Sequence, residues 1–195
     1  LMHSIVPKHI VGHNDGIDQT GECTLDTDLI GAVADNAADE TTFLLIDEWM
    51  YELGLALHNM KTPPLVVSIS WGYAETRQCG PTDFGPDMPA NCTLLGIHSN
   101  ASYTDRVNVE FLKLALRGIT LVASSGDRGA PGSINSDCSH DHDPKKALNP
   151  EFPAASPYVL SVGATSLSTS KIIDPNAPNT PKPCKPSLFF KGYLK

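Results

Sequence analysis

The stretch Leu121–Gly132, with the sequence LVASSGDRGAPG, decides the fold of this chain. An apolar run from Ile119 to Ala123 leads into small polar residues and glycines, which predicts a buried β-strand that opens into a loop. In open α/β sheets, ligands bind just beyond the carboxyl ends of the strands. Asp127 in this loop is therefore a candidate for chemistry. Because Gly-Asp is also common in turns, the loop alone leaves a purely structural role for Asp127 open.

The segments around this stretch alternate between strand and helix patterns. A short apolar strand is predicted at 9–12, with further strands at 41–46, 65–71, 119–123 and 158–162 and helices at 22–34, 47–60 and 104–117. Such alternation predicts β-α-β units and a mainly parallel sheet. Residues 77–100 are expected to form an insertion loop and 128–156 a long loop. The proline-rich segment 172–195 is expected to be an extended arm.

The composition narrows the classes of protein that the chain can belong to. It has 195 residues, of which 41% are hydrophobic and 18% charged, as in a globular domain. A net charge of −8 argues against nucleic acid as a partner. No apolar run approaches the roughly 20 residues that span a bilayer, so no membrane segment is expected. The first residues lack the features of a signal peptide, and we expect the chain to start at a processing cut.

The cysteines indicate an oxidising compartment. They are Cys23, Cys79, Cys92, Cys138 and Cys184, and none forms a C-x-x-C pair, so zinc is not expected. Cys79 and Cys92 bracket a loop rich in Pro and Gly, and we predict a disulfide between them. Sequons at Asn91 and Asn100 predict glycosylation. These features together favour a secreted, lysosomal or vacuolar protein.

Two carboxylates, Glu22 and Asp26, are spaced one helical turn apart. On a helix this spacing places their Cβ atoms roughly 5–6 Å from each other. Such a pair tends to raise one pKa and to share a proton, which suits a general base that works in acid. The spacing alone favours a solvated acidic face, and Asp28 nearby supports that alternative.

A second cluster, Cys138–Asp143, contains His140, His142 and two aspartates within six residues. Histidines and acids can bind a metal ion. However, i,i+2 spacing in a loop often occurs without a metal, so we assign no metal ligand in this chain.

Four segments resemble, in order, motifs of the sedolisin family, the serine-carboxyl peptidases. They are GECTLD at 21–26, VSISWG at 67–72, ASSGD at 123–127 and FPAASPYVLSVGAT at 152–165. The resemblance implies that residues 1–171 are part of a peptidase catalytic domain. The implied fold is a subtilisin-like α/β fold with a mainly parallel sheet and helices on both faces, incomplete in this chain. The implied activity is hydrolysis of peptide bonds at acid pH, by endopeptidase or tripeptidyl-peptidase action.

The resemblance also assigns catalytic roles by position. Glu22 would be the general base that accepts the serine proton, and Asp26 would orient Glu22. Asp127 would donate a hydrogen bond to the oxyanion of the tetrahedral intermediate. This last role requires a protonated carboxyl group, because a carboxylate would repel the developing negative charge.

The same resemblance identifies substrate-binding residues. Ser70, Trp71 and Gly72 would pair with the substrate backbone as an added strand. Ser125 and Gly126 would line the pocket for the residue before the scissile bond. Ordinary core packing is an equally strong explanation for Trp71.

The family's nucleophilic serine has no counterpart in this sequence. We therefore expect a second chain of the same precursor to carry the serine, and Cys138 or Cys184 could link the two chains. The family resemblance implies calcium as a cofactor, with its ligands outside this chain. The alternatives are an inactive sedolisin-like peptide-binding or structural protein and an ordinary subtilisin. A subtilisin would need a histidine base, for which no H-G-T-H segment is present.

Overall fold

The structure is a computed structural model, and it describes residues 9–12, 21–34, 40–46, 49–79, 90–127 and 149–164. The strands are β1 (His9–Val11), β2 (Thr42–Leu44), β3 (Val66–Ile69), β4 (Tyr73–Ala74), β5 (Thr120–Ser124), β6 (Glu151–Phe152) and β7 (Val159–Val162). The helices are α1 (Gly21–Ala34), α2 (Trp49–Asn59) and α3 (Asn100–Leu116), with a 3-10 turn, η1 (Glu75–Arg77). The proline-rich arm, Cys138, Cys184 and the cluster at 138–143 lie outside the described residues.

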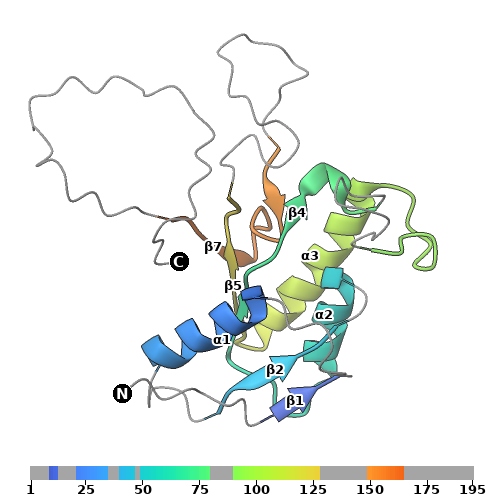
Figure 1. Ribbon diagram of the computed structural model, residues 1–195. Coiled ribbons are helices and arrows are strands. Elements are labelled where there is room, and N and C mark those ends of the chain that lie inside the picture. The colour runs from blue at the N-terminus through green and yellow to red at the C-terminus, as the bar shows by residue number, and fades with distance from the viewer. Residues whose placement is uncertain are drawn as a thin grey trace, which may run out of the picture.

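Three parallel strands form the main sheet, in the order β3-β5-β7 (Figure 1). Ile69 of β3 lies opposite Ala123 of β5, and Ser124 of β5 lies opposite Val162 of β7. Residues 121–124, with which the LVASSGD segment begins, therefore belong to the central strand of this sheet. The predicted parallel α/β arrangement is confirmed, although each strand begins or ends a few residues away from its predicted bounds.

Two smaller pairings were not predicted. β1 and β2 form a separate parallel pair, and β4 pairs antiparallel with β6, so that Tyr73 lies opposite Phe152 and Ala74 opposite Glu151. The predicted loop 128–156 was therefore wrong at its C-terminal end, because β6 lies within it. A side-chain hydrogen bond from Thr76 Oγ1 to Asn149 Oδ1 (3.1 Å) supports the pairing beside β4.

The helix α3 supplies much of the core through one apolar stripe. Its residues Tyr103, Val107, Phe111 and Leu114 are all fully buried, and this spacing of three or four residues places them on one helix face. They pack with Met50, Leu53 and Leu57 of α2. The helix begins at Asn100 instead of Thr104, because Ser99 Oγ caps it by accepting a hydrogen bond from Ser102 N–H (3.1 Å).

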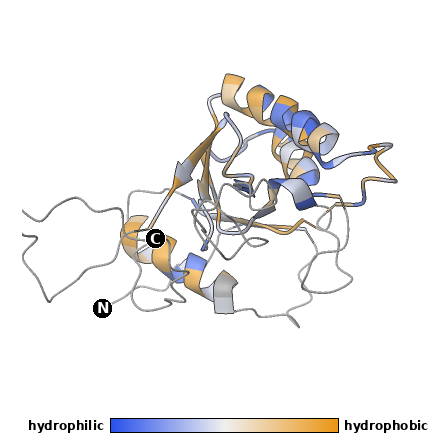
Figure 2. Cartoon of the chain, turned by 90° about the horizontal axis from the view of Figure 1, so that it is seen from above, coloured by the Kyte–Doolittle hydropathy of each residue, from blue (hydrophilic) through white to orange (hydrophobic). Residues whose placement is uncertain are grey.

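The helices lie on both sides of the main sheet. Figure 2 shows α2 and α3 together on one side of the strands and α1 on the other. The side with α2 and α3 is the well-packed one: Leu121 and Ala123 of β5 are buried there with Ile69 of β3. In contrast, most side chains of α1 are exposed or only partly buried. The arrangement agrees with the predicted fold class.

A disulfide joins Cys79 and Cys92, as the sequence predicted, with their Cα atoms 5.5 Å apart. It ties the end of η1 to the segment before α3. Cys79 N–H also donates a hydrogen bond to Asn100 Oδ1 (2.7 Å), at the first residue of α3. The start of the predicted insertion at 77–100 is therefore fixed to the helix that builds the core.

Replacing both Cys79 and Cys92 by serine is expected to lower the free energy of unfolding by about 3 kcal/mol. The reason is that a cross-link over this loop length restricts the unfolded chain by about that amount. Urea unfolding of the oxidised wild type and of the double variant measures the change. Cys23→Ser is the matched control, because Cys23 carries an exposed thiol on α1. Equal midpoints for the wild type and the double variant would contradict the prediction.

Candidate active site

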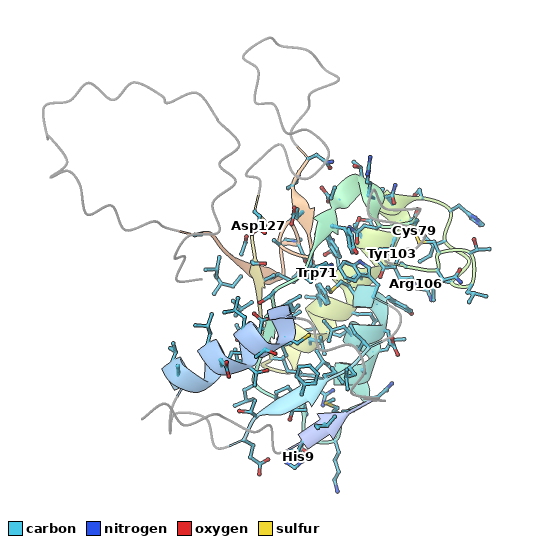
Figure 3. The ribbon with its side chains drawn as sticks, in the orientation of Figure 1. His9, Trp71, Cys79, Tyr103, Arg106 and Asp127 are labelled. Atoms are coloured by element: carbon cyan, nitrogen blue, oxygen red, sulfur yellow. A yellow bond between two sulfur atoms is a disulfide. The ribbon has the colours of Figure 1, made fainter. Side chains whose placement is uncertain are left out.

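The candidate site lies where β3 and β5 end side by side. Because Ile69 and Ala123 are paired, the segments Ser70–Gly72 and Ser125–Asp127 leave the sheet at the same edge. Ser125 N–H donates a hydrogen bond to Val162 O of β7 (2.9 Å), which fixes the start of the second segment. Figure 3 shows Trp71 and Asp127 toward the same end of the strands. This is the edge at which open α/β sheets bind their ligands.

Two features favour a glycine at position 126. Gly126 has a φ of +87°, a conformation that residues with a side chain rarely adopt. In addition, a Cβ atom at this position would overlap the carboxylate of Glu151. Glu151 also lies close to Gly72, where an added Cβ would be 3.4 Å from Glu151 Oε2 and 3.1 Å from Phe152 O. The strand β6 therefore presses against both segments of the site.

Glu151 is the site residue that sequence reasoning missed. It precedes the Phe-Pro segment of the fourth family-like motif, but no pattern in its own neighbourhood indicates a role. The only sequence signal was the pair of glycines, Gly72 and Gly126, which leave room for another group. The β4–β6 pairing is what brings the Glu151 carboxylate to them.

Trp71 does not belong to the core. Its side chain is 53% exposed, so the alternative explanation of core packing does not hold. The ring contacts that of Tyr73 edge-on, with centroids 6.5 Å apart. Asp127 is likewise exposed, at the open end of β5.

The predicted acid pair lies at the beginning of α1. Glu22 and Asp26 are one helical turn apart in this helix, as predicted. Asp26 is partly buried, whereas Asp28 is exposed. The acids of α1 and Asp127 thus come from elements on different parts of the fold.

The two sequons differ in their surroundings. Asn91 is exposed, and its Oδ1 accepts a hydrogen bond from Leu94 N–H (3.2 Å). Asn100 is partly buried, and its amide nitrogen donates to Thr76 O (2.6 Å). The Asn100 oxygen accepts from the backbone N–H groups of Gln78 and Cys79. The Asn100 side chain thus has a structural role at the start of α3.

Within the described ranges, no three His, Cys, Asp or Glu side chains gather in a way that could hold a metal ion. The cluster at 138–143 lies outside these ranges. Of the helices that the structure describes, none combines the length and the apolar character that crossing a membrane requires.

Comparison with models of protein families finds no match. Comparison with curated proteins finds physarolisin of Physarum polycephalum, which is 43% identical over 182 residues that make up 92% of this chain. The chain belongs to the sedolisin family. Human tripeptidyl-peptidase 1 is 42% identical over 80 residues, which cover 38% of this chain and 13% of that protein.

The solved structure of Pseudomonas sedolisin, in complex with two molecules of pseudo-iodotyrostatin, matches with a TM-score of 0.51. The match covers 85% of this chain and 42% of the sedolisin chain, at 20% sequence identity, so it shows the shared fold. The aligned part of physarolisin is 29% of its length. The chain therefore spans less than a third of physarolisin and corresponds to one portion of a sedolisin.

Proposed function

We propose that this chain supplies the acidic residues of an acid-acting serine-carboxyl peptidase. The observation that carries the proposal is the meeting of Ser70–Gly72 and Ser125–Asp127 at one edge of the sheet, in a chain 43% identical to physarolisin. In this proposal, the nucleophilic serine comes from another chain of the same precursor. Peptides or proteins are the substrates.

The proposed chemistry divides the work among three carboxyl groups. Glu22, ionised, accepts the proton of the serine hydroxyl as the oxygen attacks the scissile carbonyl, and Asp26 orients Glu22. Asp127, protonated, donates a hydrogen bond to the oxyanion that forms. Activity therefore requires Glu22 to be ionised and Asp127 to be protonated at the same time. This requirement gives a bell-shaped dependence of activity on pH in the acid range.

Substrate binding is assigned to the two strand-end segments. Ser70, Trp71 and Gly72 continue from β3 and pair with an extended peptide as an added strand. Ser125 and Gly126 line the pocket for the residue before the scissile bond. The exposure of Trp71 and the fixed backbone at Ser125 support these roles.

The proposal also includes the location of the enzyme, its glycosylation and its calcium cofactor. The disulfide supports a secreted, lysosomal or vacuolar location, and exposed Asn91 is the better placed of the two glycan acceptors. Calcium, if it is bound as in the family, would have its ligands outside this chain. No catalytic step is assigned to it.

The central test compares Asp127→Ala with Asp127→Asn in the protein assembled with its serine-bearing chain. Asp127→Ala is expected to lower kcat by about 10²–10³-fold, because one oxyanion donor is lost. Asp127→Asn keeps an N–H donor at every pH. It is therefore expected to retain more activity than Asp127→Ala and to remain active at higher pH than the wild type.

Steady-state hydrolysis of a fluorogenic peptide library across the acid pH range measures both effects. Intact mass under non-reducing and reducing conditions establishes in parallel which chains are present. If the assembled wild type hydrolyses no peptide in this range, the chain belongs to an inactive peptide-binding protein instead. If the two variants have the same activity and the same pH profile, Asp127 is not an oxyanion donor.

A further inference from the structure

A buried glutamine, Gln78, lies behind the candidate site with all the hydrogen-bonding groups of its amide occupied. The residue has no exposed surface. Its Nε2 donates to Tyr73 O and to Ala74 O, both at 3.0 Å. Its Oε1 accepts a hydrogen bond of 2.7 Å from the indole Nε1 of Trp49. One side chain thus holds the backbone of β4 and the ring of the first residue of α2.

This glutamine is connected to Trp71 through a row of aromatic rings. Trp49 meets Tyr73 edge-on, with ring centroids 5.0 Å apart, and Tyr73 meets Trp71 in the same way at 6.5 Å. Edge-on aromatic contacts are directional, so the position of each ring restricts the next. Of these three residues, Trp49 and Tyr73 are partly buried and Trp71 is exposed.

Gln78 is itself held firmly in place. Its backbone N–H donates to Asn100 Oδ1 (2.8 Å), at the start of α3. The next residue, Cys79, forms the disulfide to Cys92. Because the Gln78 amide is buried, fully hydrogen-bonded and held by its backbone, it can fix the orientation of the Trp49 ring and of the β4 backbone.

We propose that Gln78 is a positioning residue, which sets the ring of Trp71 as a platform for an apolar or aromatic side chain of the peptide substrate. The proposal rests on the proposed function, because it takes the site at the end of β3 to be a peptide-binding site. Gln78 acts through Tyr73 and Trp49 and does not touch the substrate. A large exposed aromatic ring can offer an apolar face to a ligand while its polar N–H stays in water.

The principal variant is Gln78→Glu, which keeps the size of the side chain. A protonated Glu can still donate to one of the two carbonyl groups of β4, whereas an ionised Glu can donate to neither. The position of the peptide that contacts Trp71 is first found by placing Phe at each position in turn. Two peptides are then compared that differ only in having Phe or Ala at that position. For the Phe peptide, we expect KM to rise about three- to tenfold at the upper end of the active pH range, and less at the lower end.

Two features separate positioning from a purely structural role. We expect kcat for the Phe peptide to change less than about twofold, and KM for the Ala peptide to stay at the wild-type value, since that peptide has no ring to place. In addition, Gln78→Glu should have no further effect on KM in a protein that already carries Trp71→Ala. A loss of kcat for both peptides, or the same rise in KM with and without Trp71→Ala, would overturn the proposal.

Two controls keep the test decisive. If Gln78→Glu does not fold, Trp49→Phe removes the indole N–H but keeps an aromatic ring, and a smaller rise in KM for the Phe peptide alone is expected. If the assembled wild type does not hydrolyse peptides, the proposed function fails by itself. The affinities of the wild type and of Gln78→Glu for the same two peptides, measured by calorimetry, then decide the role of Gln78. A loss of affinity for the Phe peptide alone supports the role. An unchanged affinity for the Phe peptide contradicts it.

Discussion

Replacing Glu22 by glutamine is expected to lower kcat by about 10⁴-fold or more in the assembled peptidase, with little change in KM. An amide of the same shape can still bind its neighbours but cannot accept the proton of the serine hydroxyl. In serine peptidases that use a histidine base, disabling the base or the group that orients it has effects of this size. Single-turnover kinetics at acid pH measure the loss directly.

Asp28→Asn is the matched control for this experiment. It removes one carboxylate from the same helix, but Asp28 is exposed and lies two residues from Asp26 and six from Glu22. Residues at this spacing do not share a helix face. We expect its activity to stay within about twofold of the wild type. If both variants lose activity equally, the effect comes from the charge of α1, and Glu22 is not the base.

Replacing Phe111 by alanine is expected to lower the free energy of unfolding by about 3–5 kcal/mol, as is usual for a fully buried Phe. Phe111 has no exposed surface, and its ring stacks on that of Phe152, with centroids 6.2 Å apart and an angle of 5° between the planes. Phe152 belongs to β6, which carries Glu151 to the site. The loss of the stack is therefore expected to loosen the site as well as the core.

Urea unfolding followed by tryptophan fluorescence measures the change in stability. Leu112→Ala is the control, because Leu112 is the next residue of α3 but is 38% exposed. Leu112→Ala is expected to lower the free energy of unfolding by well under half as much as Phe111→Ala. Similar losses for the two variants would show that the apolar stripe of α3 does not carry the core.

The sequence predicted the main sheet because its strands have strong local signals. The apolar run before Ser124 and the glycine after Ser125 mark the end of β5 without any structural information. The pair β4–β6 has no such signal, since each strand has two residues and no periodicity can be seen over that length. Their pairing is set by contacts such as that of Phe152 with Phe111, which are far apart in the sequence.

The candidate site was predictable only where turn chemistry or a family-like motif pointed to it. Asp127, Gly126 and Trp71 belong to such segments, and the structure brings their strand ends together. Glu151 and Gln78 do not, because their importance comes from what their side chains meet in space. A sequence shows that Gln78 is polar, but only the structure shows that it is fully buried with its amide in use.

The chain leaves the site after Asp127 and re-enters the described structure at Asn149, which is buried and bound to Thr76 beside β4. On one side, Ser125 is bound to β7 through its backbone N–H, and on the other, Asn149 is bound to Thr76. The strand end that carries Asp127 and the strand that carries Glu151 are thus each anchored by contacts of their own, one in the main sheet and one beside β4.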